Sequence, residues 1–173
     1  MILGLSIAIY TLTHVIISLI AIVSGLIVLF GLIGSRPLPG WTALFFTMTI
    51  LTSVGGFLFP FNGFTPAIGV GIVSLIILAV ALLARYARNF YGRWRWIYVL
   101  TVITALYFNV LVLVIQSFQK IPFLNPAAPV VGPPFAEPAN GHFVITQAVV
   151  LALFVVLGIA ALVRFRPSRF LGL

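Results

Sequence analysis

The stretch THVIISLIAIVSG, Thr13–Gly25, decides the fold because it lies inside an apolar run that extends from Leu5 to Ile33. A helix needs about 20 such residues to cross the hydrocarbon core of a bilayer. The rest of the chain has the same character, with 63% hydrophobic and 6% charged residues, too few charges to cover a soluble domain. The sequence therefore predicts an integral membrane protein, and it raises the question of why His14 lies in such a run.

Five segments are long and apolar enough to form membrane-spanning helices. They are residues 5–33, 41–59, 66–84, 96–118 and 142–163. Backbone groups in lipid must be hydrogen-bonded within their own segment, which favours helices, and the segments lack the alternation that is typical of a barrel strand. We predict an all-α integral membrane helical bundle that forms a single transmembrane domain over residues 1–173, with a proline-rich outer loop at 119–141.

Lysine and arginine are distributed unequally between the connecting segments. One side of the predicted membrane receives Arg36, Arg85, Arg88, Arg93, Arg95, Arg164, Arg166 and Arg169, and the other receives Lys120. Cytoplasmic segments carry the excess of such residues, so five spans place the N-terminus outside and the C-terminus inside. Charges divided between spans do not form the single accessible patch that nucleic acid requires, and no nucleic-acid partner is expected.

The connector RYARNFYGRWRW, Arg85–Trp96, holds four of these arginines. They are Arg85, Arg88, Arg93 and Arg95. A basic cluster at the end of a span anchors the helix at the lipid headgroups, and it can also bind anionic lipids or a protein partner. We expect these side chains to contact lipid headgroups or a partner on the cytoplasmic side.

Polar side chains within the predicted spans gather in the outer half of the membrane. They are His14, Thr52, Asn109, Gln116, His142 and Thr146. Such groups are costly in lipid unless they pair with one another or line a cavity, so they are expected to face inward. The sequence predicts an outer polar cluster that either holds the helices together or receives a small amphipathic ligand. Small residues on the His14 face also permit close helix packing, within the chain or in a homodimer.

Few classes of chemistry are open to this chain. It has no cysteine, and its one acid, Glu137, lies in the proline-rich loop, so a carboxylate pair, a catalytic triad and an intramembrane proton carrier are not expected. The leading hypothesis is a non-enzymatic accessory subunit or scaffold without a resident cofactor. Two alternatives stay open. One is a redox module that binds haem b or quinone through His14, with His142 or Asn109. The other is a passive channel or transporter lined by Thr52, Asn109 and Gln116.

Three longer runs carry a resemblance to a known group. They are HVIISLIAIVSGLIVLFGL from His14, GWTALFFTMTILTSVGGFLFPFNGFTP from Gly40 and WRWIYVLTVITALYFNVLVLVIQSFQKIP from Trp94. Together they resemble a group of small multi-span integral membrane proteins of bacteria that has no assigned activity. The resemblance implies a location in the bacterial inner membrane and supplies no catalytic residue.

Overall fold

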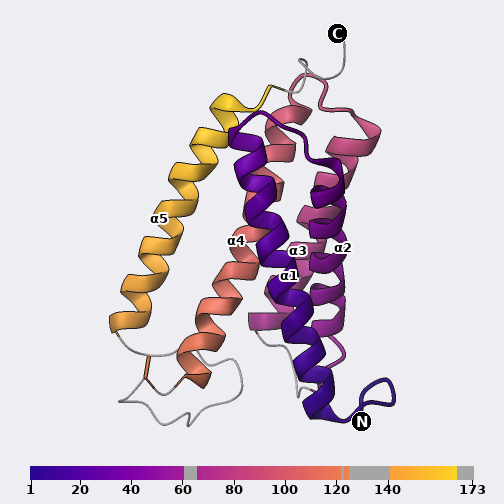
Figure 1. The fold of residues 1–173 in the computed structure, drawn as a ribbon, viewed down its shortest axis with the longest axis vertical. Helices are drawn as coiled ribbons and strands as arrows, with labels where there is room; N and C mark the ends of the chain where they lie inside the picture. Colours follow the sequence, from indigo (N-terminus) through magenta and orange to yellow (C-terminus); the bar gives the residue numbers. More distant parts are fainter. Residues whose placement is uncertain (61–65, 122, 125–140, 167–173) are drawn as a thin grey trace.

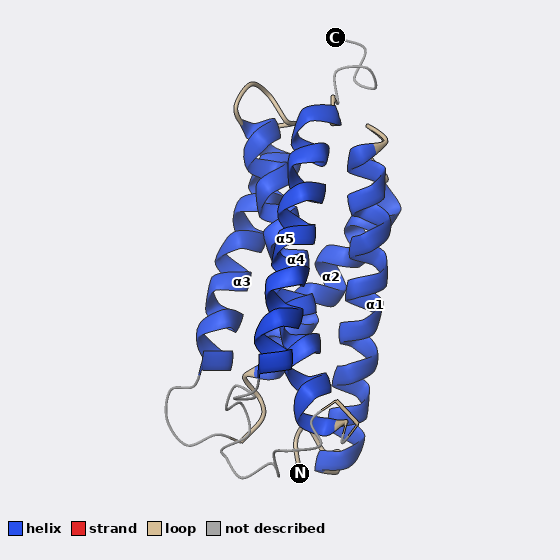
Figure 2. Ribbon diagram, turned by 90° about the vertical axis from the view of Figure 1, so that its left-hand side faces the viewer, coloured by secondary structure: helices blue, strands red, loops and turns tan. Residues whose placement is uncertain are grey.

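In the computed structural model, the described residues form five α-helices. They run roughly along one long axis (Figure 1). The structure describes residues 1–60, 66–121, 123–124 and 141–166. Their bounds are α1 Ile7–Ile33, α2 Pro39–Gly56, α3 Pro66–Leu82, α4 Trp94–Lys120 and α5 Gly141–Arg164. The described residues contain no strand beyond a single bridge between Ile2 and Leu5 (Figure 2). The prediction of an all-α helical bundle is therefore confirmed, while most of the proline-rich loop, with Glu137, lies outside the described residues.

Local sequence explains where these helices begin and end. The Ser6 hydroxyl accepts a hydrogen bond from the backbone N–H of Ile9 and caps the start of α1. Pro39 occupies the first turn of α2, where its missing N–H costs nothing. The glycine pair Gly55–Gly56 ends α2, so this helix stops short of the predicted limit at residue 59. Helix α4 is longer at both ends than the predicted 96–118.

Successive helices run in opposite directions, so their connections lie alternately at the two ends of the bundle (Figure 1). The side chain of Ser35, between α1 and α2, meets the backbone of Arg166 beyond α5, with Arg166 N donating to Ser35 Oγ at 2.9 Å. Seven arginines lie at or beside the helix termini at this end, which we call the basic end. They are Arg36, Arg85, Arg88, Arg93, Arg95, Arg164 and Arg166. In the described part of the chain, Lys120 is the one cationic side chain at the opposite end.

Buried residues of all five helices form the core, and α1, α2 and α4 meet within it. A β-carbon placed on Gly25 of α1 would meet Leu106 Cδ1 at 2.5 Å and Phe45 Cε2 at 2.8 Å. Any larger side chain there would therefore require the Leu106 and Phe45 side chains to shift. Helix α5 is peripheral and contacts α4 and α1 through a narrow stripe. Its buried residues are Phe143, Phe154, Gly158 and Ala161.

Four segments are long and apolar enough to cross a membrane. They are Ile7–Ile33, Ile68–Ala87, Trp94–Lys120 and Gly141–Arg164. Their outward faces carry large exposed aliphatic side chains, such as Val156 and Ile159 of α5, as lipid-facing helices do. Helix α2 is shorter, with 18 residues, and is rich in threonine. The structure thus shows a helical bundle with four apolar helices of membrane-spanning length and a fifth, more polar helix packed against α1 and α3.

Helix α3 does not end as a regular α-helix. Residues Leu83–Ala87 form one turn of π-helix, which carries Arg85. Together with the last four turns of α3, this turn completes the apolar segment Ile68–Ala87. Short π-helical turns occur mostly inside or at the end of α-helices, frequently at functional sites.

Candidate functional site

His14 lies on the face of α1 that packs against the end of α2. A β-carbon placed on Gly55 would be 3.3 Å from His14 Nδ1, so the imidazole lies directly against the α2 backbone. The ring also contacts Phe59 edge-to-face, with centroids 5.3 Å apart. One turn earlier, Tyr10 donates a hydrogen bond to the Gly55 carbonyl at 2.9 Å. The prediction that His14 faces a neighbouring helix is consistent with this position.

Asn109 and Thr52 form hydrogen bonds between helices. Asn109 Nδ2 on α4 donates to Thr49 Oγ1 on α2 at 3.1 Å. Thr52 Oγ1 and Ser18 Oγ are 3.4 Å apart. The Ser18 hydroxyl already donates to the His14 carbonyl at 2.8 Å, so Thr52 is the donor in this pair. Both groups therefore satisfy hydrogen bonds within the bundle, and Thr49 and Ser18 supply partners that the sequence-based cluster did not include.

Gln116 lies at the same height in the bundle as His14. Helices α1 and α4 are antiparallel and in contact at Gly25 and Leu106. Gln116 is ten residues beyond Leu106, and His14 is eleven residues before Gly25, which are rises of about 15 and about 16 Å in the same direction. Gln116 also shares a helical face with Asn109, seven residues earlier, whose amide reaches α2.

The side-chain carbonyl of Gln116 is not hydrogen-bonded by any residue that the structure describes. Its Oε1 is buried and has no hydrogen-bond partner among the described residues. Lys120, one turn further along α4, lies close enough to His14 for an electrostatic interaction. We call these two residues of equal height the His14–Gln116 site, in which His14 packs on the end of α2 and Gln116 keeps a buried acceptor without a described donor.

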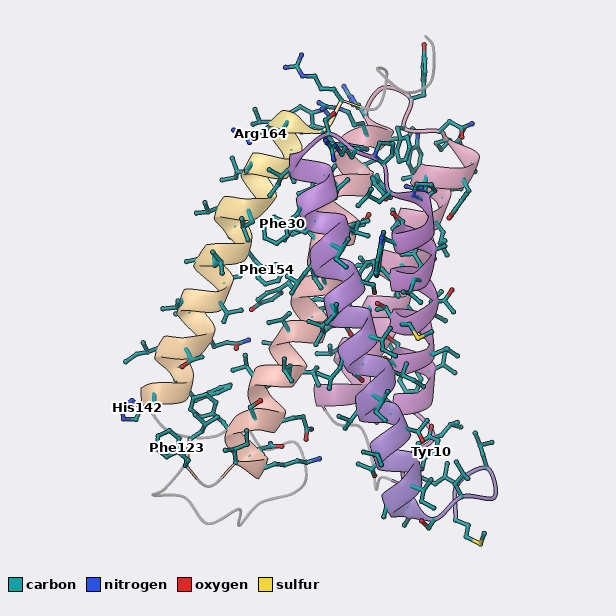
Figure 3. All side chains as sticks on the ribbon, in the orientation of Figure 1. Tyr10, Phe30, Phe123, His142, Phe154 and Arg164 are labelled. Atoms are coloured by element: carbon teal, nitrogen blue, oxygen red, sulfur yellow. The ribbon has the colours of Figure 1, made fainter. Side chains whose placement is uncertain are left out.

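His142 and Thr146 do not join this site. His142 is exposed at the start of α5, and Figure 3 places it on the opposite side of the bundle from Tyr10, which lies one turn from His14. Thr146 lies on the same peripheral helix and is half-buried. The six predicted residues therefore separate into an inner set on α1, α2 and α4 and an outer pair on α5.

Gln147 is a half-buried residue with a buried side-chain amide, and sequence reasoning missed it. Both of its side-chain polar atoms are buried without a hydrogen-bond partner in the described part of the chain. It shares the α5 face of Phe143 and Phe154, whose rings contact Phe118 and Tyr107 of α4 at 5.6 Å in each case. Its spacing of four and seven residues from those aromatic residues was the available signal, since it places the amide on the packed face.

The four arginines of the connector have different environments. Arg85 is buried, and Arg95 Nη1 donates to the carbonyls of Leu162 and Phe165, which the end of α5 leaves without helical partners. Arg88 lies over the Trp94 ring and Arg95 over the Trp96 ring, at 5.2 and 5.0 Å. Arg93 is exposed. Arg85 is thus buried in the protein and Arg95 binds the end of α5, while Arg88 and Arg93 lie at the surface.

A shallow groove of about 230 Å³ lies on the outer surface between α1 and α2. It is lined by Leu19, Ile20, Val23, Ser24, Trp41 and Leu44. None of the six predicted polar residues lines it, and its walls are almost wholly apolar. We interpret it as part of the lipid-facing surface.

Comparison of the chain with known protein families, with curated proteins and with solved structures found no match in any of the three. Among the described residues, no group of three or more His, Cys, Asp or Glu side chains could hold a metal ion.

Proposed function

We propose that the protein is a non-enzymatic integral membrane protein of the bacterial inner membrane that acts as an accessory subunit or scaffold. In this proposal all five helices span the membrane, with the N-terminus outside and the C-terminus inside. The polar head of a small amphipathic ligand binds at the His14–Gln116 site. The observation that supports the ligand is the buried Gln116 Oε1, which lies at the height of His14 and has no donor in the described part of the chain.

The chemistry of the site defines the ligand class. A buried amide carbonyl without a hydrogen bond costs about 1–3 kcal/mol, and a ligand that donates to it recovers this cost. Neutral imidazole has one N–H donor and one acceptor nitrogen. A hydroxyl or amide head can therefore donate to Gln116 and also hydrogen-bond His14, while its apolar part lies among the helices or in lipid.

The proposed orientation is supported by the position of the charges. Seven described arginines lie at the basic end, which the positive-inside rule assigns to the cytoplasm. Tryptophans at 41, 94 and 96 lie at the same end, as aromatic residues do at a membrane interface. The His14–Gln116 site then lies in the outer half of the bilayer, on the side of Lys120.

The redox alternative is weaker for haem than for quinone. Two histidines that ligate one haem must face each other, whereas His142 lies across the bundle from the α1 end that carries His14 (Figure 3). A quinone carbonyl requires only a donor, and His14 can supply one. The channel alternative loses two of its lining groups, because Asn109 and Thr52 are engaged in interhelical hydrogen bonds.

The test is purification from the bacterial inner membrane in a mild detergent, followed by mass spectrometry of extracted small molecules and an absorption spectrum before and after dithionite reduction. We expect a bound amphipathic molecule in the wild type, and its loss in His14→Ala and Gln116→Leu. His142→Ala is the matched control, because this histidine is exposed on α5, and it should retain the molecule. A preparation that holds no such molecule, or that loses it equally in all three variants, would contradict the ligand proposal. A Soret band that disappears in His14→Ala would establish the haem alternative.

The accessory role is tested separately. Crosslinking of the tagged protein in native membranes, followed by purification, should capture specific membrane proteins at defined stoichiometry. A monodisperse protein without a crosslinked partner would contradict an accessory role and leave the ligand proposal intact.

A further inference from the structure

Arg85 is an arginine at the basic end whose charge has no described anionic partner. Its exposed fraction is 9%, and it lies in the π-helical turn at the end of the third apolar segment. The only acidic side chain of the chain is Glu137, which lies outside the described residues, so no described side chain is negatively charged. Ionisable residues in such segments usually have a functional partner, because an uncompensated buried charge is costly.

The groups around Arg85 hold the guanidinium without neutralising it. Nη1 donates to the Tyr98 hydroxyl at 3.0 Å. The rings of Tyr86, Phe90 and Tyr98 lie 5.5, 5.7 and 5.8 Å from Cζ. Aromatic faces attract a cation, and they leave its charge unchanged. A guanidinium has five N–H donors, and a hydroxyl accepts from only a part of them.

Tyr98 is itself fixed in position. Its side chain is fully buried. Its ring packs against the rings of Phe90 and Phe165, with centroids 4.8 and 6.0 Å away. The hydroxyl that accepts from Arg85 is therefore held in place by packing, and this limits the orientations of the guanidinium.

The surroundings of Arg85 identify the level of the membrane at which it lies. Tyr86, the next residue, is 57% exposed, and Trp41 and Trp96 at the same end are about half exposed. Such aromatic side chains lie at the level of the lipid headgroups. The other arginines of the basic end add positive potential, which attracts anionic lipids. Arginine binds phosphate through two parallel N–H donors, a geometry that a fixed guanidinium presents without further loss of entropy.

We propose that Arg85 binds the phosphate of an anionic phospholipid in the leaflet at the basic end, with Tyr98 as a positioning residue. The lipid phosphate supplies the negative charge that the chain lacks, and the exposed Tyr86 ring flanks the headgroup. This site lies at the other end of the bundle from the His14–Gln116 site and is independent of it.

The test uses the full-length protein after delipidation in a mild neutral detergent. Phosphatidylglycerol, phosphatidylcholine and inorganic phosphate are added separately, and binding is measured by native mass spectrometry and by the shift of the melting temperature. We expect wild-type protein to bind phosphatidylglycerol and to be stabilised by it far more than by phosphatidylcholine. Arg85→Gln should weaken phosphatidylglycerol binding by about tenfold or more, because a charge-assisted pair is lost. The exposed Arg93→Gln, with the same charge change, should alter it by no more than about twofold.

Two further variants separate binding from folding. Arg85→Lys keeps the charge and loses the paired donors, so an intermediate affinity is expected. Tyr98→Phe keeps the ring and removes the hydroxyl that orients the guanidinium, and it should lower affinity for phosphatidylglycerol with little effect on phosphatidylcholine. Equal stabilisation of the wild type by both lipids would overturn the proposal, even if Arg85→Gln fails to fold. An equal loss in Arg93→Gln would also overturn it, and an equal effect of inorganic phosphate would show that a free anion is the ligand.

Discussion

The two ends of the bundle are built differently. At the basic end, Phe90, Tyr98 and Phe165 pack together, with ring centroids 4.8 to 6.0 Å apart, and join the connector, α4 and the chain after α5. At the opposite end, α1 and α2 are joined through Tyr10 and Gly55, and Gln116 and Gln147 keep buried polar atoms without described partners. One end is fully packed around a charge, and the other retains unused hydrogen-bonding capacity.

This difference shows where stability and binding are expected to reside. A packed aromatic cluster resists substitution, because removing a ring leaves a cavity. A buried amide without a partner lowers stability. Polar groups inside a membrane usually have a functional partner, so such an amide indicates a binding role. Substitutions at the two ends should therefore differ in size and, for the glutamines, in sign.

The largest effect is expected at Tyr98. Tyr98→Ala removes a fully buried ring from the basic end and should lower the free energy of unfolding by about 3–5 kcal/mol. Unfolding by SDS in mixed micelles measures this change. Tyr91→Ala is the control, since that ring is 82% exposed in the connector, and it should have almost no effect. Equal losses in both variants would show that the cluster does not stabilise this end.

A smaller effect is expected where α1 meets the end of α2. Gly55→Val places a branched side chain 3.2 Å from the Tyr10 hydroxyl and 3.3 Å from His14 Nδ1, and it should cost about 1–3 kcal/mol. The matched control is Gly56→Val, because a β-carbon there would approach only His14 Cε1, at 4.0 Å. The melting temperatures of the two variants give the comparison. If Gly56→Val proves the more damaging, His14 does not pack against Gly55 as described.

The Asn109–Thr49 hydrogen bond should contribute less. Asn109→Ala is expected to cost about 0.6–2 kcal/mol, as interhelical hydrogen bonds in membranes do. A double-mutant cycle with Thr49→Val measures the coupling between the two side chains. Thr104→Val provides a control, because that hydroxyl donates to Leu100 within its own helix. A coupling energy indistinguishable from zero would show that this hydrogen bond does not stabilise the packing of α2.

The smallest effect, and one of opposite sign, is expected at Gln147. Gln147→Leu removes a buried amide without a described partner, so stability should stay unchanged or rise by up to about 1 kcal/mol. Ala148→Leu adds apolar volume at the neighbouring exposed position and serves as the control. A marked loss of stability in Gln147→Leu alone would mean that this amide has a partner in the membrane.

The sequence was sufficient to predict where the helices lie in the chain, and it was not sufficient to predict the contacts between them. Apolar length placed all five helices to within three residues at either end, because lipid imposes a helix on any such segment. Proline and glycine near residues 39 and 55 account for the shift of the second helix. The sequence could not separate α5, with His142 and Thr146, from the inner set, because which helix faces which is decided by packing.

Contacts between residues that are distant in the sequence could not be predicted either. In the sequence, Arg85 is one of four equivalent arginines of the connector. The fold brings it to Tyr98, which lies thirteen residues later and on the next helix. His14 and Gln116 were predicted to share a cluster from depth alone, and the heights of the two residues in the bundle agree with that expectation. Whether they bind a common ligand stays a prediction.

The unequal lengths of α1 and α2, 27 and 18 residues, have a consequence for the surrounding lipid. They correspond to about 40 and about 27 Å along the helix axis, so the apolar belt of the protein is taller on the α1 side than beside α2. Exposed apolar side chains at Ile7, Ile9 and Leu12 continue this belt past the end of α2. In a bilayer, acyl chains beside α1 would have to stretch relative to those beside α2, and this mismatch around the circumference would favour a tilt of the protein.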